Sequence, residues 1–266
     1  EYCLKEDIPF VVLYKEGTLI KFRDKKKQKK LFDGKRFLGS HLLLPNQTTK
    51  ALFEQFGTFQ SNDVDIRAVG IPRFEIYKEP MPAGEHIVFF YFDPSQKAAI
   101  ANSKFEGDPL FLLNKQLKTI LADLAYASKH HPIVIKTKNK NELDSLRVFM
   151  SDNDIQLEGS NVKFDSKSDA FHLLKQAFCV IGNFSTTLVE ARLAGRRVFA
   201  PLAGLHNGDQ FFFSIGVKDV SEFKALIGTD LRDLDPVDPN LVSDVSVNYV
   251  GNSAADVASV LRKAVA

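Results

Sequence analysis

Residues 179–201 read CVIGNFSTTLVEARLAGRRVFAP, and this stretch decides the fold. An apolar run ends at Gly182, and a turn rich in hydroxyl groups, Ser185–Thr187, opens a stretch with helical spacing that ends at Gly195. The next apolar run follows at once, which is the spacing of a tight strand–helix–strand unit. The sequence therefore predicts strands at Cys179–Gly182 and Arg197–Ala200, with a helix at Thr187–Ala194 between them.

The same alternation begins at about His86 and continues along the chain. Repeated strand–helix units with apolar strands indicate a parallel sheet covered on both faces. Such sheets bind ligands beyond the carboxyl ends of their strands, so the loops after strands are where we expect chemistry. The further predicted strands are His86–Phe92, Ile133–Lys136 and Ile155–Leu157, and the further predicted helices are Pro109–Ser128, Asn141–Ser151, Asp169–Ala177, Ser221–Ile227 and Ala254–Ala264.

The N-terminal third carries fragments of the same pattern. Strands are expected at Phe10–Tyr14 and Ile66–Val69, and Asn46 is placed to cap a helix that runs to about Phe56. The stretch Pro80–Gly84 disfavours both helix and central strand, so we place a domain boundary there. The prediction is an α/β protein of two Rossmann-like domains facing a cleft, with residues 1–85 forming the N-terminal domain and residues 86–266 the C-terminal domain. Since the first domain is short and the chain begins at Glu1, we expect a piece of a longer protein.

Composition excludes several classes of function. A net charge of +2 over 266 residues argues against a nucleic-acid partner. Cys3 and Cys179 make no metal-binding spacing, and they fit a reducing compartment, although a single disulfide remains an alternative. No apolar run reaches the length of a membrane-spanning helix, and no Gly-x-Gly-x-x-Gly or Gly-Lys-Ser/Thr phosphate loop is present. We expect a cytoplasmic protein that uses neither a metal ion nor a cofactor.

The turn Ser185-Thr186-Thr187 is the candidate phosphate site. A helix N-terminus presents unpaired N–H groups and partial positive charge, and the hydroxyls add donors without bulk. The alternative is that Ser185 is only a helix N-cap. Glu190, one turn inside the helix, either accepts hydrogen bonds from a ribose or is a carboxylate favoured by the helix dipole.

This segment resembles the donor-binding element of GT-B glycosyltransferases, in which a turn of small or hydroxyl residues precedes a helix that carries Glu and ends in Gly. The resemblance is best over residues 86–227. In addition, Gly70-Ile-Pro-Arg73 is similar to the Gly-x-Pro-Arg that ends the N-terminal domain in bacterial capsule and cell-wall polymer transferases of this fold. The resemblance implies transfer of a sugar from a nucleotide-sugar donor to a hydroxyl of a surface glycan of capsule or lipopolysaccharide type. Arg73 then either contacts a phosphate or pairs with a carboxylate.

A narrower resemblance is to bacterial sialyltransferases and related CMP-sugar transferases. Of their acidic-acidic-Gly motif, only Glu16 and Gly17 are matched, whereas Ser185-Thr186 matches their phosphate-binding Ser/Thr pair. Their His-Pro pair is absent after Ile133–Lys136, where Thr137-Lys138 stands. Lys136 or Lys138 neutralises phosphate charge in its place, or is an ordinary solvated lysine. The resemblance favours a CMP-sugar donor and an inverting mechanism in which Glu16 is the base, the alternative being a turn carboxylate.

Other activities of the same fold stay open. A CDP-alditol phosphotransferase would share the phosphate-binding turn, and a UDP-sugar epimerase would need further acids and histidines in the cleft. In the non-enzymatic alternative the chain is a nucleotide-sugar-binding sensor or a scaffold domain of a polysaccharide assembly complex, and needs no catalysis. The acceptor is expected to be a glycan or a lipid-linked glycan. The basic cluster Lys25–Lys30 is either a solvated surface or a peripheral contact with the inner face of the membrane.

Overall fold

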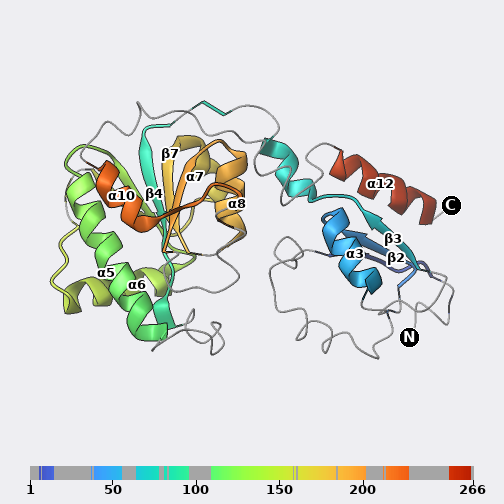
Figure 1. Cartoon of the computed structure of the whole chain (residues 1–266), viewed down its shortest axis with the longest axis horizontal. Coiled ribbons are helices and arrows are strands. Elements are labelled where there is room, and N and C mark those ends of the chain that lie inside the picture. The colour runs from blue at the N-terminus through green and yellow to red at the C-terminus, as the bar shows by residue number, and fades with distance from the viewer. Residues whose placement is uncertain are drawn as a thin grey trace. The chain divides into compact units, whose positions relative to one another are not determined.

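The computed structural model divides by its internal contacts into two units, which are Glu1–Glu79 with Asn240–Ala266, and Pro80–Pro239 (Figure 1). Each unit is an α/β arrangement built on its own parallel sheet. The sequence placed residues 240–266 with the second domain, whereas here they group with the first unit. The residues that the structure describes are 6, 8–14, 37, 39–55, 64–77, 81–82, 84–95, 109–157, 159, 161–183, 185–201, 212, 214–227 and 252–264.

The first unit contains a three-stranded parallel sheet in the order β1-β2-β3. Asn46 caps helix α3 as predicted, because its side-chain oxygen accepts a hydrogen bond from the Thr49 amide at 2.7 Å. The strands are β1 (Val11–Leu13), β2 (His41–Leu44) and β3 (Asp65–Ala68), and the helices are α3 (Gln47–Gln55), the 3-10 helix η2 (Pro72–Tyr77) and α12 (Ser253–Ala264).

Helix α12 belongs to the first unit through two contacts. Val260 packs into a cluster with Leu43 and Val69, and the Ala254 amide donates to the Glu75 carboxylate at 2.8 Å. The second contact joins residues 179 positions apart in the sequence. Local periodicity shows that this helix has an apolar face, but it carries no information about which sheet that face covers.

The second unit contains a six-stranded sheet in the order β6-β5-β4-β7-β8-β9, with every pairing parallel. The strand order reverses between β4 and β7, as in the Rossmann fold. The strands are β4 (His86–Phe90), β5 (Ile133–Lys136), β6 (Val162–Asp165), β7 (Ala177–Gly182), β8 (Arg197–Ala200) and β9 (Lys218–Asp219), and the helices are α5 (Pro109–Ala127), α6 (Lys140–Asp152), α7 (Ala170–Gln176), α8 (Thr186–Leu193) and α10 (Val220–Leu226).

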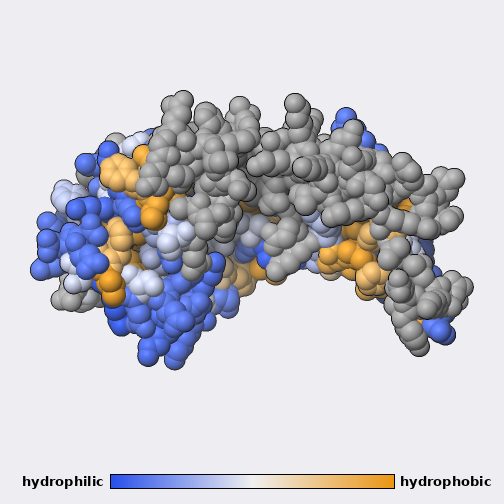
Figure 2. Space-filling view, turned by 90° about the horizontal axis from the view of Figure 1, so that it is seen from below, coloured by the Kyte–Doolittle hydropathy of each residue, from blue (hydrophilic) through white to orange (hydrophobic). Residues whose placement is uncertain are grey.

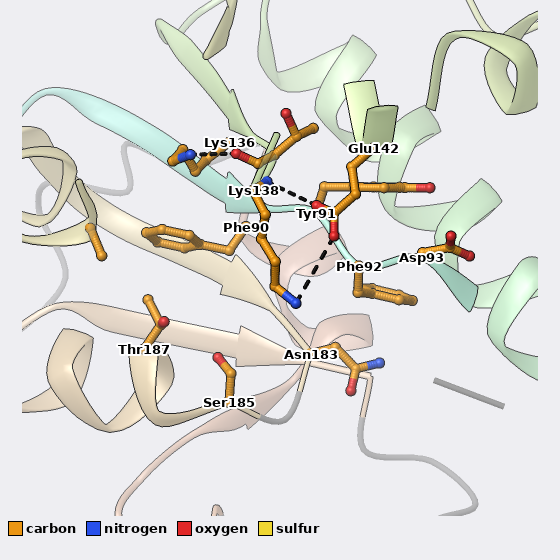
Figure 3. Close-up of a pocket in the computed structure, with 12 residues that line it drawn as sticks. Phe90, Tyr91, Phe92, Asp93, Lys136, Lys138, Glu142, Asn183, Ser185 and Thr187 are labelled. Atoms are coloured by element: carbon orange, nitrogen blue, oxygen red, sulfur yellow. Dashed lines mark hydrogen bonds and ion pairs between the residues drawn. The ribbon is translucent and has the colours of Figure 1, made fainter. Parts of the chain in front are cut away.

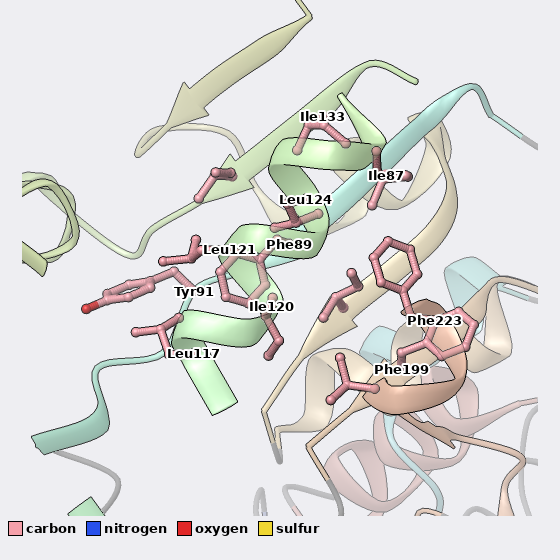
Figure 4. Packing of buried hydrophobic residues seen from close by; sticks show 14 of the residues in the cluster. Ile87, Phe89, Tyr91, Leu117, Ile120, Leu121, Leu124, Ile133, Phe199 and Phe223 are labelled. Atoms are coloured by element: carbon pink, nitrogen blue, oxygen red, sulfur yellow. The ribbon is translucent and has the colours of Figure 1, made fainter. Parts of the chain in front are cut away.

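The core of this unit lies between the sheet and helices α5 and α10. Alternate residues of β4, Ile87 and Phe89, pack with the apolar face of α5 (Figure 4). Phe199 of β8 meets Phe223 of α10 with ring centroids 5.5 Å apart. Burial of each such side chain stabilises the fold by about 1.5–3 kcal/mol. The face of α5 that contributes to the core is formed by Leu113, Leu117, Ile120, Leu121 and Leu124.

The surface differs from this core in composition. Figure 2 shows mainly hydrophilic residues on the visible part of the second unit, at the left, with small hydrophobic areas between them. Exposed apolar side chains on α5 and α6 are Leu110, Phe111, Tyr126 and Val148. None of the helices in the described parts of the chain combines the length and the apolar character needed to cross a membrane.

One predicted strand is wrong. Residues Ile155–Leu157 are not a strand, and β6 lies at Val162–Asp165 instead. Ile155 donates its amide to the Met150 carbonyl at 2.9 Å, and Asp154 has a φ of 54°, which together end α6 in a Schellman motif. The apolar Ile155 side chain therefore belongs to the end of this helix and not to a strand of the sheet.

The chain passes very close to itself just before β4. The Gly84 amide donates to the Ala177 carbonyl at 3.2 Å, which extends the β4–β7 pairing by one bond. A Cβ atom on Gly84 would lie 1.9 Å from the Gln176 carbonyl oxygen. Only glycine leaves room for this approach, because the obstacle is backbone.

Gly84→Ala is therefore expected to lower the free energy of unfolding by about 3 kcal/mol or more, since the backbone of α7 or β4 must move to remove the clash. Gly159→Ala is the comparison variant, because its added Cβ would meet nothing within 4 Å although its φ is 152°. Backbone strain alone costs about 1–3 kcal/mol. Denaturant unfolding of both variants checks this, and a smaller loss for Gly84→Ala than for Gly159→Ala would contradict it.

Candidate functional site

A cavity of about 270 Å³ lies at the carboxyl edge of the second unit's sheet, beside the point where the strand order reverses (Figure 3). This is where open parallel sheets bind their ligands. Its volume is slightly below the range of about 300–1,000 Å³ that is usual for ligand pockets. The lining residues end or follow β4 and β5, follow β7, or lie at the beginning of α6, α7 and α8. They are Phe90, Tyr91, Phe92, Asp93, Lys136, Thr137, Lys138, Glu142, Ala170, Asn183, Ser185 and Thr187.

The predicted phosphate turn forms one wall of the cavity. Ser185 is the N-cap residue of α8 and has extended backbone, with φ −152° and ψ 161°. Its carbonyl accepts the Leu188 amide at 3.1 Å, but its hydroxyl makes no capping hydrogen bond. Ser185 thus occupies the N-cap position without the side-chain bond that usually explains a serine there. Both Ser185 and Thr187 line the cavity.

Gly182 allows helix α8 to begin this close to the sheet. All six residues of β7 are buried, and the strand ends at this glycine. A Cβ atom on Gly182 would lie 3.0 Å from a methyl group of Leu188 and 3.6 Å from the Cβ of Phe90. Even an alanine at this position would require the Leu188 side chain to shift by a few tenths of an ångström, next to Phe90, which lines the cavity.

The two predicted lysines lie on the β5 side of the same cavity. Lys136 is the last residue of β5, and its ammonium group donates to the carbonyl of Thr137. The Lys138 side chain is 77% exposed, and its Nζ lies 4.0 Å from Oε1 of Glu142. In Figure 3 the Lys138 ammonium points toward the wall that carries Ser185 and Asn183. The structure therefore brings together four predicted residues, which are Lys136, Lys138, Ser185 and Thr187.

Four other predicted residues are not among those that line this cavity. Thr186 and Glu190 lie on α8 and are half-buried. Arg73 lies in the first unit, in η2, where its exposed guanidinium is 5.3 Å from the ring centroid of Phe74. Glu16 falls outside the described residues, as does the cluster Lys25–Lys30. Their assigned roles stay predictions.

Sequence reasoning missed several polar residues of the cavity, among them Asn183, Asp93 and Glu142. Asn183 is buried directly after β7. Asp93 follows β4, and one of its oxygens accepts hydrogen bonds from the Ser95 amide at 2.9 Å and the Ser95 hydroxyl at 2.6 Å. Glu142 is the third residue of α6, and the pattern Asn139-x-x-Glu142 is close to a capping box, a signal that could have identified it.

Tyr91 separates the cavity from the core. Burial, together with the negative charges of Asp93 and Glu142, raises the pKa of its phenol far above the ordinary value. The phenol therefore stays protonated at neutral pH, and Tyr91 can donate a hydrogen bond but cannot act as a base. Within the described part of the chain, no group of three or more His, Cys, Asp and Glu side chains is arranged to hold a metal ion.

The turn after β6 is held by a single carboxylate. Asp165 accepts hydrogen bonds from the amides of Lys167 and Ser168 at 2.9 and 2.8 Å and from the Ser168 hydroxyl at 2.7 Å, with Lys163 Nζ 3.8 Å away. Burial alone would raise the pKa of Asp165, but the bonds from Ser168 and Lys167 outweigh it and lower the pKa to about 2. The ionised form thus stabilises this turn.

Comparison with known proteins identifies the fold. No protein-family model and no curated protein sequence matches this chain significantly. Among solved structures, MnaA of S. aureus with UDP has a TM-score of 0.58 at 12% identity, covering 96% of this chain and 69% of that one. A variant of the wall teichoic acid polymerase TagF, with CDPG, has a TM-score of 0.51 at 12% identity, covering 91% of this chain. This chain spans 61% of the length of TagF. The likeness confirms the predicted α/β, GT-B-like fold with parallel sheets.

The Asp165 turn leads to a pH prediction. The folded-state pKa lies below the unfolded value of 3.8, so its contribution is present above that value and is lost as the pH falls toward about 2. We expect Asp165→Asn to remove up to about 2 kcal/mol of stability at pH 7 and to have little effect near pH 2. Urea unfolding of both proteins at several pH values measures this. A difference that stays constant with pH would show that the ionised carboxylate does not stabilise the turn.

Proposed function

We propose that this chain is a glycosyltransferase that moves a sugar from a nucleotide-sugar donor, a CMP-sugar in the first instance, to a hydroxyl of a surface glycan with inversion. One observation carries the proposal. The Ser185 hydroxyl is at the N-terminus of α8, is not used for capping, and lines the same cavity as Lys136 and Lys138. Hydroxyls, first-turn amides and ammonium groups at one edge of a parallel sheet together form a phosphate-binding arrangement.

The chemistry of the donor fits this arrangement. The leaving nucleotide phosphate gains negative charge in the transition state, and donors already in place stabilise it without reorganisation. Ser185 and Thr187 supply hydroxyls, and Lys136 and Lys138 supply positive charge. The Phe90 ring is directed into the cavity and offers an apolar face to a base or a sugar (Figure 3). We also propose that Glu190 and Thr186 contact the nucleotide and that Arg73 contacts a phosphate.

The structural neighbours support a nucleotide ligand and a surface-polymer acceptor. The MnaA structure contains UDP, and TagF is a wall teichoic acid polymerase. We place Glu16 as the base that deprotonates the acceptor hydroxyl while it attacks the anomeric carbon. The acceptor is a glycan or a lipid-linked glycan, and the basic cluster Lys25–Lys30 would bring the protein to the cytoplasmic face of the membrane that carries it.

A second candidate is a CDP-alditol phosphotransferase. The TagF variant with CDPG shares this fold over 91% of the chain. The two reactions would use the same cavity but break different bonds, since the acceptor attacks the anomeric carbon in one and phosphorus in the other. The nucleotide product does not separate them, because a CMP-sugar and a CDP-alditol both release CMP. The polymer product does, because only the second reaction leaves a phosphodiester in the polymer.

The proposal predicts that nucleotides stabilise the folded protein through Ser185. A thermal-shift series with CMP, CDP, UDP, GDP and ADP should give a concentration-dependent rise in Tm for at least one nucleotide, with CMP or CDP preferred. Ser185→Ala should weaken that binding about tenfold or more, because it removes a hydrogen bond to a charged oxygen. Ser145→Ala, an exposed serine on α6, is the control and should bind as the parent does. A folded protein whose Tm no nucleotide changes would contradict the site assignment and favour the scaffold alternative.

The proposed base gives a separate prediction. Glu16→Gln should lower kcat for sugar transfer by about 10²–10⁴-fold and leave the Kd of the nucleotide unchanged, because the carboxylate acts only in the chemical step. Glu6→Gln, an exposed carboxylate in the same unit, is the control. Turnover is followed by release of the free nucleotide from the donor. Unchanged turnover in Glu16→Gln would remove Glu16 from the mechanism while leaving the donor site intact.

A further inference from the structure

One buried carboxylate in the cavity wall contacts a single lysine in two ways. Oε2 of Glu142 accepts a hydrogen bond from the Lys138 backbone amide at 2.8 Å, and Oε1 lies 4.0 Å from Lys138 Nζ. The Glu142 side chain is only 8% exposed, whereas that of Lys138 is 77% exposed. Both residues line the cavity. The backbone of Lys138 is thus fixed while its ammonium is held only loosely.

Helix capping alone does not account for this arrangement. Asn139 is the N-cap of α6, and its side-chain oxygen accepts the Glu142 amide at 2.9 Å, which is one half of a capping box. In the usual second half, the glutamate returns a bond to the N-cap amide. Here the carboxylate reaches one residue further, to Lys138. The bond therefore fixes the residue that brings an ammonium group to the cavity.

Helix α10 shows what the same spacing does away from the cavity. Lys218, the N-cap Asp219 and Glu222 occupy the same three positions relative to α10. Their ion pair is shorter, with Lys218 Nζ 3.2 Å from Glu222 Oε2, and both side chains are about half exposed, at 56% and 50%. Sequence spacing by itself thus gives an ordinary surface ion pair. The burial of Glu142, and its bond to the lysine amide, are particular to α6.

We propose that Glu142 is a positioning residue that holds Lys138 at the cavity and competes with the ligand phosphate for its ammonium. This inference rests on the proposed function, since it requires a phosphate at the Ser185 turn. When that phosphate is bound, the ammonium leaves Glu142 for the phosphate while the backbone bond keeps Lys138 in place. The carboxylate consequently weakens nucleotide binding and accelerates release of the nucleotide product.

Glu142→Gln tests the competition directly. Glutamine retains an oxygen that can accept the Lys138 amide, but it removes the negative charge. We expect the Kd values of CMP, CDP and UDP, for those that the parent protein binds, to fall about three- to tenfold by isothermal titration calorimetry in about 50 mM NaCl. The gain in affinity should be smaller in about 500 mM NaCl, because salt screens interactions between charged groups but does not change side-chain packing. Glu222→Gln is the matched control and should leave these Kd values unchanged.

A double-mutant cycle shows whether Glu142 acts through Lys138. In a Lys138→Gln background, the gain from Glu142→Gln should fall below about twofold. An undiminished gain would mean direct repulsion of the phosphate and would overturn the inference, as would weaker or unchanged binding in Glu142→Gln itself. If Glu142→Gln does not fold, Lys138→Gln becomes the deciding variant, because the Lys138 side chain is exposed. Lys138→Gln must then weaken nucleotide binding at least about threefold, and a smaller effect would overturn the inference. Absence of nucleotide binding by the parent protein would instead refute the proposed function, and the inference with it.

Discussion

The parallel pairing of β4 with β7 is the interaction on which the candidate site depends. These strands are about 90 residues apart in sequence, yet they are hydrogen-bonded neighbours from His86↔Ala177 to Phe90↔Gly182. The chain builds outward from β4 to β6 on one side and from β7 to β9 on the other. This pairing therefore decides which loops meet at the carboxyl edge. It places Phe90 beside Gly182, the glycine just before the Ser185 turn. A slip of one residue in the pairing would turn the side chains of one strand to the opposite face of the sheet.

The two edges of this sheet use polar groups differently. Toward the amino ends of the strands, buried arginines are committed to backbone: Arg192 donates to the carbonyls of Ile215 and Arg196 at 2.6 and 3.0 Å, and Arg196 donates to the Leu174 carbonyl at 2.9 Å. Burial lowers the pKa of Arg196. These bonds tie α7, α8 and β8 together at a fixed geometry. At the carboxyl edge, by contrast, the Ser185 hydroxyl and the Lys138 ammonium are held weakly or not at all. The Ser185 hydroxyl and the Lys138 ammonium are therefore among the groups available to a ligand at the carboxyl edge.

Local pattern predicted most of the second unit, because its strands and helices are short-range features of the chain. Ile133–Lys136 and Arg197–Ala200 are strands with the predicted bounds, and the Ser185 turn begins a helix as expected. The failures have a physical basis. Ile155 follows a helix end and packs its side chain against the core, and periodicity cannot distinguish such an apolar residue from part of a short strand. The place of α12 depends on a contact between residues far apart in the sequence, which periodicity does not show. The spacing Asn139-x-x-Glu142 marks Glu142 in the sequence, but the burial of its side chain at the cavity depends on the folded structure.

The residues after β5 limit what this edge can contribute to a reaction. In the transferases that the sequence resembles, a His-Pro pair stands there, and imidazole can both donate and accept a proton near neutrality. Lys136 and Lys138 carry ammonium groups, which donate hydrogen bonds and neutralise charge but accept none. Tyr91 is also held in its protonated form. The two lysines can therefore neutralise charge but cannot remove a proton from an acceptor. The carboxylates of the cavity, Asp93 and Glu142, already accept hydrogen bonds from the Ser95 and Lys138 amides. For these reasons the base in our proposal is a carboxylate from elsewhere in the chain, the role we assign to Glu16.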